Sequence, residues 1–329
     1  MEAIMPVIFV GVLAASILLY VLLDGFDLGV GILYLFEHDR ADRDTMMLSI
    51  APIWDGNETW LVAGAVLLLA GFPAAYAAVM PAFYLPLMLM LLALIFRGVA
   101  FEFRFKARRS RFVWDMAFAG GSVVAAFCQG LVLGGYIGGT ADGDVTFRWL
   151  SPFAIFCGAA VVAGYTLHGA CWLIMKAEGE LEARMRALAP KLLVVALAAL
   201  GAVSLWTPLH STRIAERWFA WPNIALLAPV PIATALCALW LWRTARTGTY
   251  APFLAVSAIF ALGMLGLGVS LWPYVVPFRV TIWDSAAPMP SLWFSLIGVI
   301  LFLPAVLAYT AWSYWVFRGK VRMDAGAYH

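Results

Sequence analysis

The sequence predicts an all-α polytopic membrane protein with about nine transmembrane helices. Hydrophobic residues make up 64% of the 329-residue chain and charged residues 12%, and the mean hydropathy of +0.91 lies far outside the range of soluble globular domains. Nine apolar stretches of roughly 18 to 30 residues are each long enough to cross ~30 Å of hydrocarbon as a helix. They cover approximately residues 6–36, 50–71, 75–97, 114–139, 149–175, 189–207, 222–242, 252–273 and 291–317.

The connections between these stretches are short. No Ser/Gly-rich or strongly charged tract is long enough to form a linker or a soluble domain, so we expect one membrane-embedded domain over residues 1–329. The first stretch lacks a basic start and a small-residue cleavage motif. We therefore interpret it as a retained span and not as a signal peptide.

Basic residues predict the orientation, because Lys and Arg accumulate in cytoplasmic loops. If the N-terminus is outside, all but four of the 21 basic residues fall on the cytoplasmic side. The four outer residues are Arg148, Arg213, Arg217 and Arg279. Nine spans then place the C-terminus inside. The net charge of +2 gives no indication of nucleic-acid binding.

Two aspartates interrupt the first stretch, in VLLDGFDLGVGIL. Asp24 and Asp27 stand one helical turn apart and share a helix face. A rise of 1.5 Å per residue places them roughly 27 to 32 Å from Pro6, in the cytoplasmic part of the span. Because a charge inside a bilayer costs several kcal/mol, both aspartates are candidates for a functional role.

The second stretch opens with SIAPIWDGNETWLVAG, in which Asp55 and Glu58 are again three residues apart, flanked by Trp54 and Asn57. Since the intervening loop HDRADRDTM is short, we expect all four carboxylates to form one cluster near the cytoplasmic side. Clustered, partly buried acids can exchange protons near neutral pH, which predicts a site of proton uptake. The structural alternative is that Asp55 and Glu58 are cap and first-turn acids that interact favourably with the helix dipole.

The third and fourth stretches meet in the basic, aromatic segment FRGVAFEFRFKARRSRFVWDM, most of which is typical of a cytoplasmic loop resting on anionic lipid. Arg97 and Asp115 lie nearest the helix ends and are candidates for salt bridges with the acidic cluster. An arginine that extends to the membrane surface is the commoner outcome for such a position.

Potential metal ligands are scarce. His168 in the fifth stretch is the only histidine predicted within the membrane, since His38 and His210 fall in loops and His329 ends the chain. Because no second intramembrane histidine is available as the other ligand of a haem iron, we interpret His168 as a hydrogen-bonded packing residue and not as a haem ligand. The four cysteines, Cys128, Cys157, Cys171 and Cys237, show no metal-binding spacing. We expect the chain itself to bind no metal.

Several ordered motifs carry a resemblance to a known family. They are DGFDLGVGIL, IAPIWDGNETWLVAG, FRGVAFEFR, the WD at 114–115, TIWDSAAP and LAYTAWSYWVFRG. Together they resemble subunit II of the cytochrome bd type ubiquinol oxidases, from one end of the chain to the other. The chain is similar to the shorter members, close to those called cyanide-insensitive oxidases.

The resemblance implies a heterodimer with a haem-bearing subunit I in the bacterial cytoplasmic membrane. That partner would hold two b-type haems and a d-type or third b-type haem, and would carry out quinol oxidation and oxygen reduction. Subunit II of this family has no haem ligands, folds as two four-helix bundles plus one further helix, and in some members holds a structural quinone. Asp55 falls on the WDGN motif, whose aspartate is assigned to a proton path, and Asp24 and Asp27 fall on the DGFD motif.

Two other classes of function compete with this interpretation. A proton-coupled transporter also has intramembrane acids and internal similarity, and here IWDG at 53–56 recurs as IWDS at 282–285, and FRG at 96–98 recurs at 317–319. A purely structural partner would only cover the apolar face of another subunit. The sequence leaves open which quinone is used and whether a small accessory single-helix peptide joins the complex.

Overall fold

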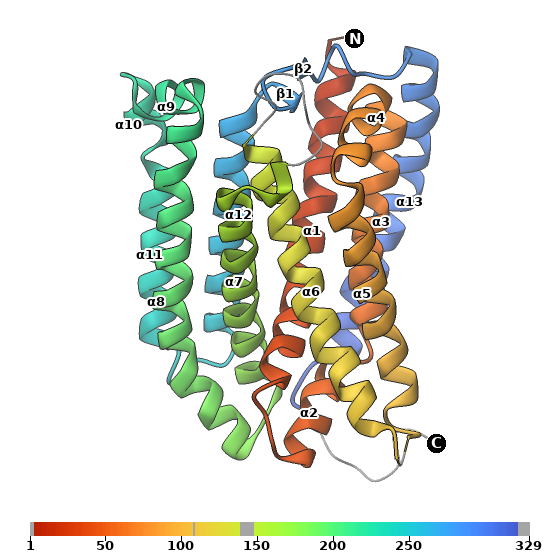
Figure 1. Ribbon diagram of the computed structural model, residues 1–329, viewed down its shortest axis with the longest axis vertical. Coiled ribbons are helices and arrows are strands. Elements are labelled where there is room, and N and C mark those ends of the chain that lie inside the picture. Colours follow the sequence, from red (N-terminus) through yellow and green to blue (C-terminus); the bar gives the residue numbers. More distant parts are fainter. Residues whose placement is uncertain (1–2, 108, 139–147, 322–329) are drawn as a thin grey trace.

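A computed structural model describes residues 3–107, 109–138 and 148–321, without the side chains of Arg148 and His210. Arg108, Arg322 and His329 lie outside the described residues. The described chain is helical almost throughout (Figure 1). The helices and strands are α1 (Met5–Tyr34), α2 (Arg40–Ile50), α3 (Trp54–Gly71), α4 (Pro73–Ala82), α5 (Tyr84–Phe103), α6 (Arg111–Ile137), the 3₁₀ turn η1 (Arg148–Leu150), α7 (Pro152–Lys176), α8 (Gly179–His210), α9 (Thr212–Phe219), α10 (Asn223–Leu227), α11 (Pro229–Thr244), α12 (Ala251–Leu271), β1 (Tyr274–Val276), β2 (Val280–Thr281) and α13 (Met289–Val316).

The predicted fold class is confirmed. Eight described segments are helical, long and apolar enough to cross a membrane, and each corresponds to one of the nine predicted spans. The other predicted span is α3, whose polar first turn makes it less apolar than these eight. It packs between α1 and α13 and completes the set.

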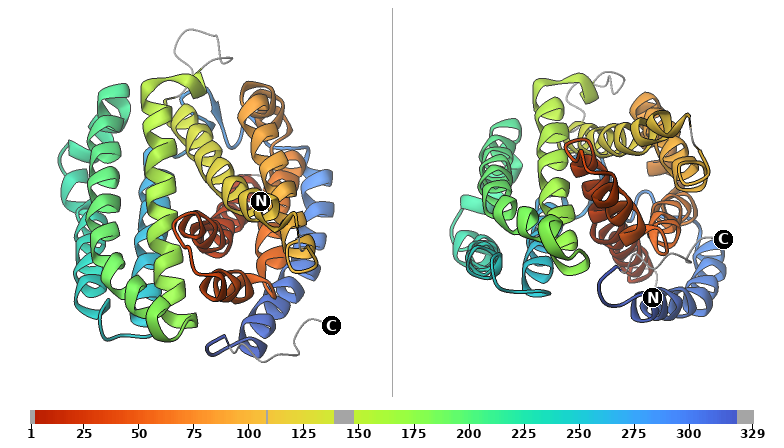
Figure 2. Two further views of the ribbon diagram at one scale, coloured as in Figure 1. Left: turned by 60° about the horizontal axis from the view of Figure 1, so that its bottom comes forward. Right: turned by 90° about the horizontal axis from the view of Figure 1, so that it is seen from below.

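The helices form two four-helix bundles and one peripheral helix, as the family resemblance implies. The N-terminal bundle contains α1, α3, the α4–α5 pair and α6, and the C-terminal bundle contains α7, α8, α11 and α12. Seen along the bundle axis, the two groups lie side by side, with α13 outside the N-terminal bundle against α3 (Figure 2). The bundles meet where α7 packs on α1 and α6.

Two glycines allow the closest approach at this junction. A Cβ atom at Gly29 of α1 would lie 1.8 Å from the backbone oxygen of Tyr165, and one at Gly169 of α7 would lie 2.3 Å from the backbone carbon of Gly29. Backbones this close exclude any side chain. The glycines therefore fix the contact between the bundles.

Several predicted boundaries were wrong, because local breaks and caps override the apolar pattern. Asp39 accepts hydrogen bonds from the first turn of α2, so the expected loop is helical from Arg40 onwards. Pro52 lacks an N–H group and separates α2 from α3. The predicted spans at 75–97 and 222–242 are each divided into two helices. The helix α8 begins at Gly179, ten residues before the predicted span. The helix α9 and the β1–β2 hairpin were not predicted.

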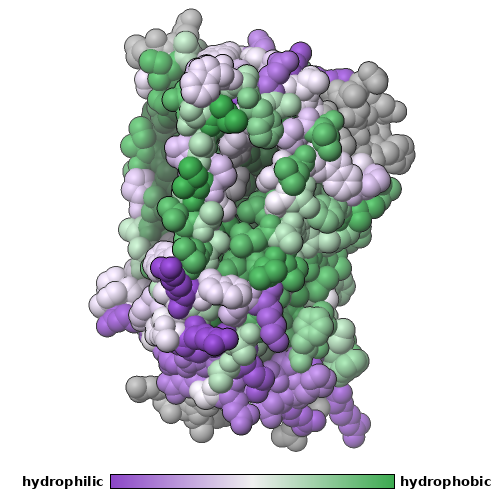
Figure 3. Space-filling model, turned by 90° about the vertical axis from the view of Figure 1, so that its left-hand side faces the viewer, coloured by the Kyte–Doolittle hydropathy of each residue, from purple (hydrophilic) through white to green (hydrophobic). Residues whose placement is uncertain are grey.

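The two ends of the molecule differ in polarity. Residues near the two chain ends lie at opposite ends of the bundle, as an odd number of spans requires (Figure 1). Hydrophilic side chains gather at the lower end, where the described chain finishes, below a broad apolar face (Figure 3). This distribution matches the predicted orientation, with the basic end in the cytoplasm.

Candidate functional site

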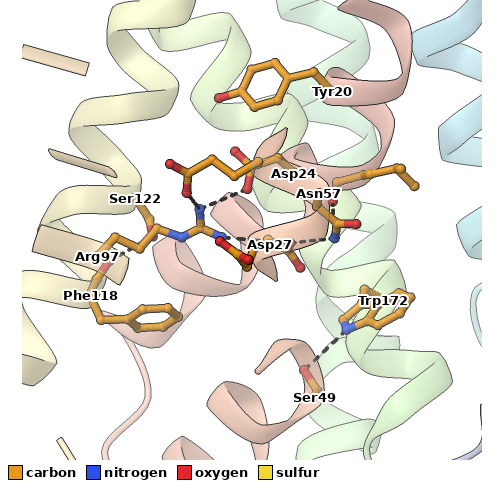
Figure 4. A network of polar contacts seen from close by, with 12 residues as sticks. Tyr20, Asp24, Asp27, Ser49, Asn57, Arg97, Phe118, Ser122 and Trp172 are labelled. Atoms are coloured by element: carbon orange, nitrogen blue, oxygen red, sulfur yellow. Dashed lines mark hydrogen bonds and ion pairs between the residues drawn. The ribbon is translucent and has the colours of Figure 1, made fainter. Parts of the chain in front are cut away.

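The guanidinium group of Arg97 lies at the centre of a buried charge cluster. Arg97 extends from α5 between α1 and α3 (Figure 4). Its Nη1 atom is 2.9 Å from Oδ1 of Asp24 and 3.7 Å from Oε2 of Glu58, and its Nη2 atom is 3.9 Å from Oδ2 of Asp27. The side chains of Arg97, Asp24 and Asp27 are fully buried, whereas that of Glu58 is 26% exposed. The salt bridge for which Arg97 was a candidate is therefore present, and the commoner alternative, an arginine that extends to the membrane surface, is wrong for this residue.

Asn57 connects this cluster to the peripheral helix. Its Nδ2 atom donates to Oδ2 of Asp27 at 2.7 Å and to the backbone oxygen of Leu23 at 3.3 Å. Its Oδ1 atom accepts a hydrogen bond from the hydroxyl group of Tyr314, on α13, at 2.9 Å. One amide thus holds α1, α3 and α13 at the same level.

The break at Pro52 explains why polar residues of α3 lie so deep. Since the chain turns at residues 51–53, α3 begins beside the middle of α1 and not at its end. Trp54 stacks on Phe101 of α5, with ring centroids 4.8 Å apart, and fixes this first turn against the neighbouring helix. The acids of α1 therefore meet the first turns of α3 inside the bundle, about two to three turns before α1 ends.

Asp55 differs from the other three acids. It lies in the first turn of α3 with an exposed side chain, and no hydrogen bond or ion pair joins its carboxylate to the described residues. The prediction of one cluster of four carboxylates is correct for Asp24, Asp27 and Glu58, whereas Asp55 lies at the exposed edge of the cluster, near enough for its charge to act on Glu58. Its position in the first turn is the one that the structural alternative requires, because a negative charge there is favoured by the helix dipole.

Asp115 belongs to a second cluster at the cytoplasmic ends of α1, α5 and α6. Its Oδ1 atom lies 2.5 Å from the hydroxyl group of Tyr34 and 2.5 Å from Nε of Arg104, and its Oδ2 atom is 3.3 Å from Nη1 of Arg43. Arg104 also lies 2.6 Å from Asp44 of α2. The expected contact of Asp115 with the membrane acids was wrong, because Arg104 is closer to it than the Arg97 cluster.

The Arg97 cluster is incompletely satisfied within the described protein. Buried atoms without a hydrogen-bond partner there are Asp24 Oδ2, Asp27 Oδ1, Glu58 Oε2, and Arg97 Nε and Nη2. Buried polar atoms almost always have partners, and internal water commonly supplies them. The concentration of such atoms around one guanidinium marks a polar interior that suits hydration.

A chain of neutral polar groups lies one turn farther along α1. Gln129 of α6 donates from Nε2 to the hydroxyl oxygen of Tyr20 at 2.7 Å and accepts from the hydroxyl group of Tyr165 at 2.8 Å. Figure 4 shows Tyr20 beside Asp24. The polar interior of the N-terminal bundle therefore continues beyond the charge cluster towards α7.

Sequence reasoning missed several members of these clusters. Tyr314 stands in the quoted motif LAYTAWSYWVFRG, but its distance along the sequence gave no indication of a contact with Asn57. Arg104 was assigned to the ordinary basic loop, although it is only 1% exposed. Gln129 was the available signal for a polar interior, because an amide in an apolar span needs partners.

His168 lies in the C-terminal bundle in surroundings that do not fit a haem ligand. Its ring stacks against Phe253 and Phe260, with centroids 5.0 and 5.3 Å away, and its Nε2 atom is 3.1 Å from Oγ of Ser257. Within the described part of the chain, no group of three or more His, Cys, Asp or Glu residues is placed to hold a metal ion.

Fold and site together define a polytopic helical membrane subunit with a buried, partly unsatisfied charge cluster beside an exposed acid. The chain belongs to the cytochrome bd terminal oxidase subunit II family, whose sequence model matches residues 5–317. It is 30% identical to cytochrome bd-I ubiquinol oxidase subunit 2 of Escherichia coli K12, over 96% of this chain and 94% of that protein.

Two further comparisons agree with this family. The chain is 30% identical to cytochrome bd ubiquinol oxidase subunit 2 of Bacillus subtilis 168, over 91% of each protein. Its fold matches a chain of the bd oxidase from Geobacillus thermodenitrificans with a TM-score of 0.76 over 95% of this chain and 97% of that one. At 18% identity, this last comparison shows the shared fold alone.

The transporter interpretation loses its main support. In the second copy of the recurring motif, Asp284 follows β2 and accepts a hydrogen bond from Oγ1 of Thr281 at 2.6 Å in an exposed turn. Asp55, in the first copy, lies in the first turn of a membrane helix. The two motifs therefore occupy unlike positions and do not form a structural repeat.

Proposed function

We propose that this chain takes up protons from the cytoplasm and passes them to the haem-bearing subunit I of a quinol:oxygen oxidoreductase in the bacterial cytoplasmic membrane. In that partner, quinol is oxidised and oxygen is reduced to water. Reduction of one oxygen molecule to water consumes about four protons, so a polar route into the membrane is required. The two b-type haems and the d-type or third b-type haem belong to the partner in this proposal.

The charge balance around Arg97 is the observation that carries the proposal. Asp24, Asp27 and Glu58 surround a single guanidinium, so a fully ionised cluster would have a net charge of −2. Burying unbalanced charge costs several kcal/mol. A proton held within the cluster reduces this cost, and a shared proton among closely spaced carboxylates is one that can be exchanged.

On the side of α3 that is turned away from the bundle core, the cluster reaches the surface of the protein. Glu58 is partly exposed and faces both Arg97 and the surface, and Asp55 lies three residues earlier on the exposed side. Near the level of Asn57 and Arg97, the α13 and α5 helices present large exposed apolar side chains, among them Tyr309, Trp312 and Ile95. A large apolar surface around a carboxylate suits a protein partner in the membrane, and we assign this face to subunit I.

The roles of the acids follow from these positions. Asp24 and Asp27 hold the proton next to Arg97, while Glu58 and then Asp55 pass it to the partner. Trp54 and Asn57 act as positioning residues, because they fix the first turn of α3 through Phe101 and Asp27. We assign no residue of this chain to a quinone or to an accessory peptide.

Replacing Asp55 by asparagine tests the proposal. An amide keeps the shape of the side chain but cannot release and regain a proton, so the Asp55→Asn complex should assemble with normal haem content. We expect oxygen consumption and proton uptake on the cytoplasmic side to slow about tenfold or more. The matched control is Glu102→Gln, because the Glu102 carboxylate is 74% exposed at the end of α5 and, among the described residues, forms an ion pair only with Lys106. Normal turnover in a fully assembled Asp55→Asn complex would refute the assigned role.

A further inference from the structure

The short helix α9 creates a basic pocket at the N-terminal end of the molecule. It follows α8 directly and lies across the end of the C-terminal bundle (Figure 1). Ile214 is buried beneath it, and Nε1 of Trp218 donates to Oγ of Ser270 on α12 at 2.8 Å. The helix is therefore amphipathic and fixed to the bundle, with its polar side turned away from the core.

Two of the four arginines predicted outside the cytoplasm lie on α9. Nη1 of Arg217 donates to the backbone oxygen of Val269 at 2.8 Å and to that of Trp272, at the end of α12. Nη1 of Arg213 is 3.5 Å from the hydroxyl oxygen of Tyr274. Neither guanidinium has a carboxylate within ion-pair distance in the described parts of the chain, so two positive charges remain without a counterion.

Both arginines line one pocket of about 440 Å³. The other polar groups that line it are Glu216, Asn223, Ser270 and Tyr274, and Trp272 and Phe278 supply aromatic walls. The pocket thus combines two guanidinium groups, one carboxylate and hydrogen-bonding groups. A soluble anion would meet the carboxylate, whereas a zwitterion can match both signs of charge.

The surroundings of the pocket are typical of a membrane surface. Leu209 is 84% exposed, Trp221 80% and Phe219 59%; Leu209 and Trp221 flank α9, and Phe219 is its last residue. Tryptophan and other large apolar side chains anchor amphipathic helices at the boundary between headgroups and acyl chains. The face below, formed by α8 and α11, is apolar over most of its height (Figure 3). A ligand in the pocket can therefore extend apolar chains along this face.

We propose that the pocket binds the headgroup of an amine-bearing phospholipid, phosphatidylethanolamine, from the leaflet on the N-terminal side. Arg213 and Arg217 hold the phosphodiester, because guanidinium groups bind phosphate oxygens through charge-assisted hydrogen bonds. The Glu216 carboxylate pairs with the ammonium group and disfavours a net-negative headgroup. The bound lipid fixes α9 and the end of α12 at the membrane surface, far from the face assigned to subunit I (Figure 2).

Native mass spectrometry of the purified, delipidated oxidase complex tests this site. The complex is titrated with dioctanoyl phosphatidylethanolamine, dioctanoyl phosphatidylglycerol or inorganic phosphate. We expect the ethanolamine lipid to bind, and Arg213→Gln to weaken its binding about tenfold or more, because one charge-assisted contact is lost. Arg213 caps no helix, so this variant should assemble. The matched control is Arg318→Gln, whose guanidinium contacts Trp315 at the opposite end of the molecule.

A second variant tests the headgroup. Glu216→Gln should remove the preference for phosphatidylethanolamine over phosphatidylglycerol, since the carboxylate supplies that preference. Equal weakening by Arg213→Gln and Arg318→Gln would overturn the site. Displacement of the lipid by inorganic phosphate at similar concentration would show a free-anion site and overturn the lipid assignment. Tighter binding of phosphatidylglycerol to the unchanged protein would overturn the choice of headgroup.

Discussion

The two four-helix bundles share one architecture but have very different interiors. The N-terminal bundle buries Asp24, Asp27, Arg97 and Arg104, whereas the buried polar residues of the C-terminal bundle within the described chain are Thr166, His168 and Lys176, all on α7. Lys176 lies at the last residue of its helix. A membrane bundle of this shape therefore forms without charges at its centre. Buried ion pairs contribute little net stability, which agrees with our proposal that the charges of the N-terminal bundle serve proton transfer.

The contact between the bundles should be the most sensitive place in the protein. Gly29→Val adds a Cβ where the backbone oxygen of Tyr165 lies only 1.8 Å away, so α1 and α7 would have to separate. We expect no assembled complex, measured as haem content per membrane protein and as the complex peak in size-exclusion chromatography. Gly263→Val on α12 is the matched control, because a Cβ there meets nothing within 4 Å. Normal assembly of Gly29→Val would show that the bundles pack differently.

Removing the central charge should distinguish the two interiors. Arg97→Leu leaves Asp24 and Asp27 buried without a counterion, which should cost about 3–5 kcal/mol of stability and lower the melting temperature of the purified complex strongly. Adding Asp24→Asn and Asp27→Asn should restore most of that stability, because the uncompensated charges disappear.

The matched change in the C-terminal bundle is His168→Phe. It keeps the stacking with Phe253 and Phe260 and loses only the contact with Ser257, so the cost should be about 1 kcal/mol. The haem absorption bands of the His168→Phe complex should be unchanged at equal protein. An effect of His168→Phe as large as that of Arg97→Leu would remove the distinction between the bundles, and a missing haem band would contradict the packing role of His168.

The sequence predicted the fold class and the pairing of Asp24 and Asp27 with Glu58, because both depend on local pattern and on the cost of charge in lipid. It failed where the chain breaks inside an apolar stretch. Hydropathy gives no sign of the turn at residues 51–53, and this turn places the start of α3 beside residues in the interior of α1. It also failed for contacts between distant segments. Tyr314 reaches Asn57 across 257 residues, and no local signal predicts that approach.

The choice between Arg97 and Arg104 as partners of Asp115 shows the same limit. Both arginines come from one basic, cytoplasmic segment, and their spacing of seven residues places them on one face of α5. Which acid each of them meets depends on the depths of α1, α3 and α6, which packing decides. The positive-inside pattern describes where arginines accumulate on average and does not identify those that become buried.

The smallest effect should come from the ionic link between the bundles at the cytoplasmic surface, where Nη2 of Arg184 on α8 is 2.7 Å from Oε2 of Glu37. Burial tends to raise the pKa of Glu37, but hydrogen bonds from the Asp39 N–H group and from Arg184 outweigh burial and lower the pKa below its ordinary value of 4.5. The stability from this link is therefore complete above the ordinary pKa and is lost as the pH falls through the lower, folded-state pKa.

Glu37→Gln should consequently destabilise the complex at neutral pH by less than about 1 kcal/mol, since the pair is partly exposed and Arg184 keeps Asp42 as a partner. The difference from the unchanged protein should shrink towards zero as the pH falls below 4.5 and through the lowered folded-state pKa of Glu37, because the carboxylate then binds a proton in the folded state as well. Denaturant midpoints measured at several pH values check this, with Glu180→Gln as the matched control because the Glu180 side chain is 95% exposed at 3.8 Å from Arg184. A difference that stays constant from neutral to acid pH would show that Glu37 acts through packing. The Glu37–Arg184 contact would then contribute no charge-dependent stability. The two bundles would differ electrostatically only in the charges buried inside them.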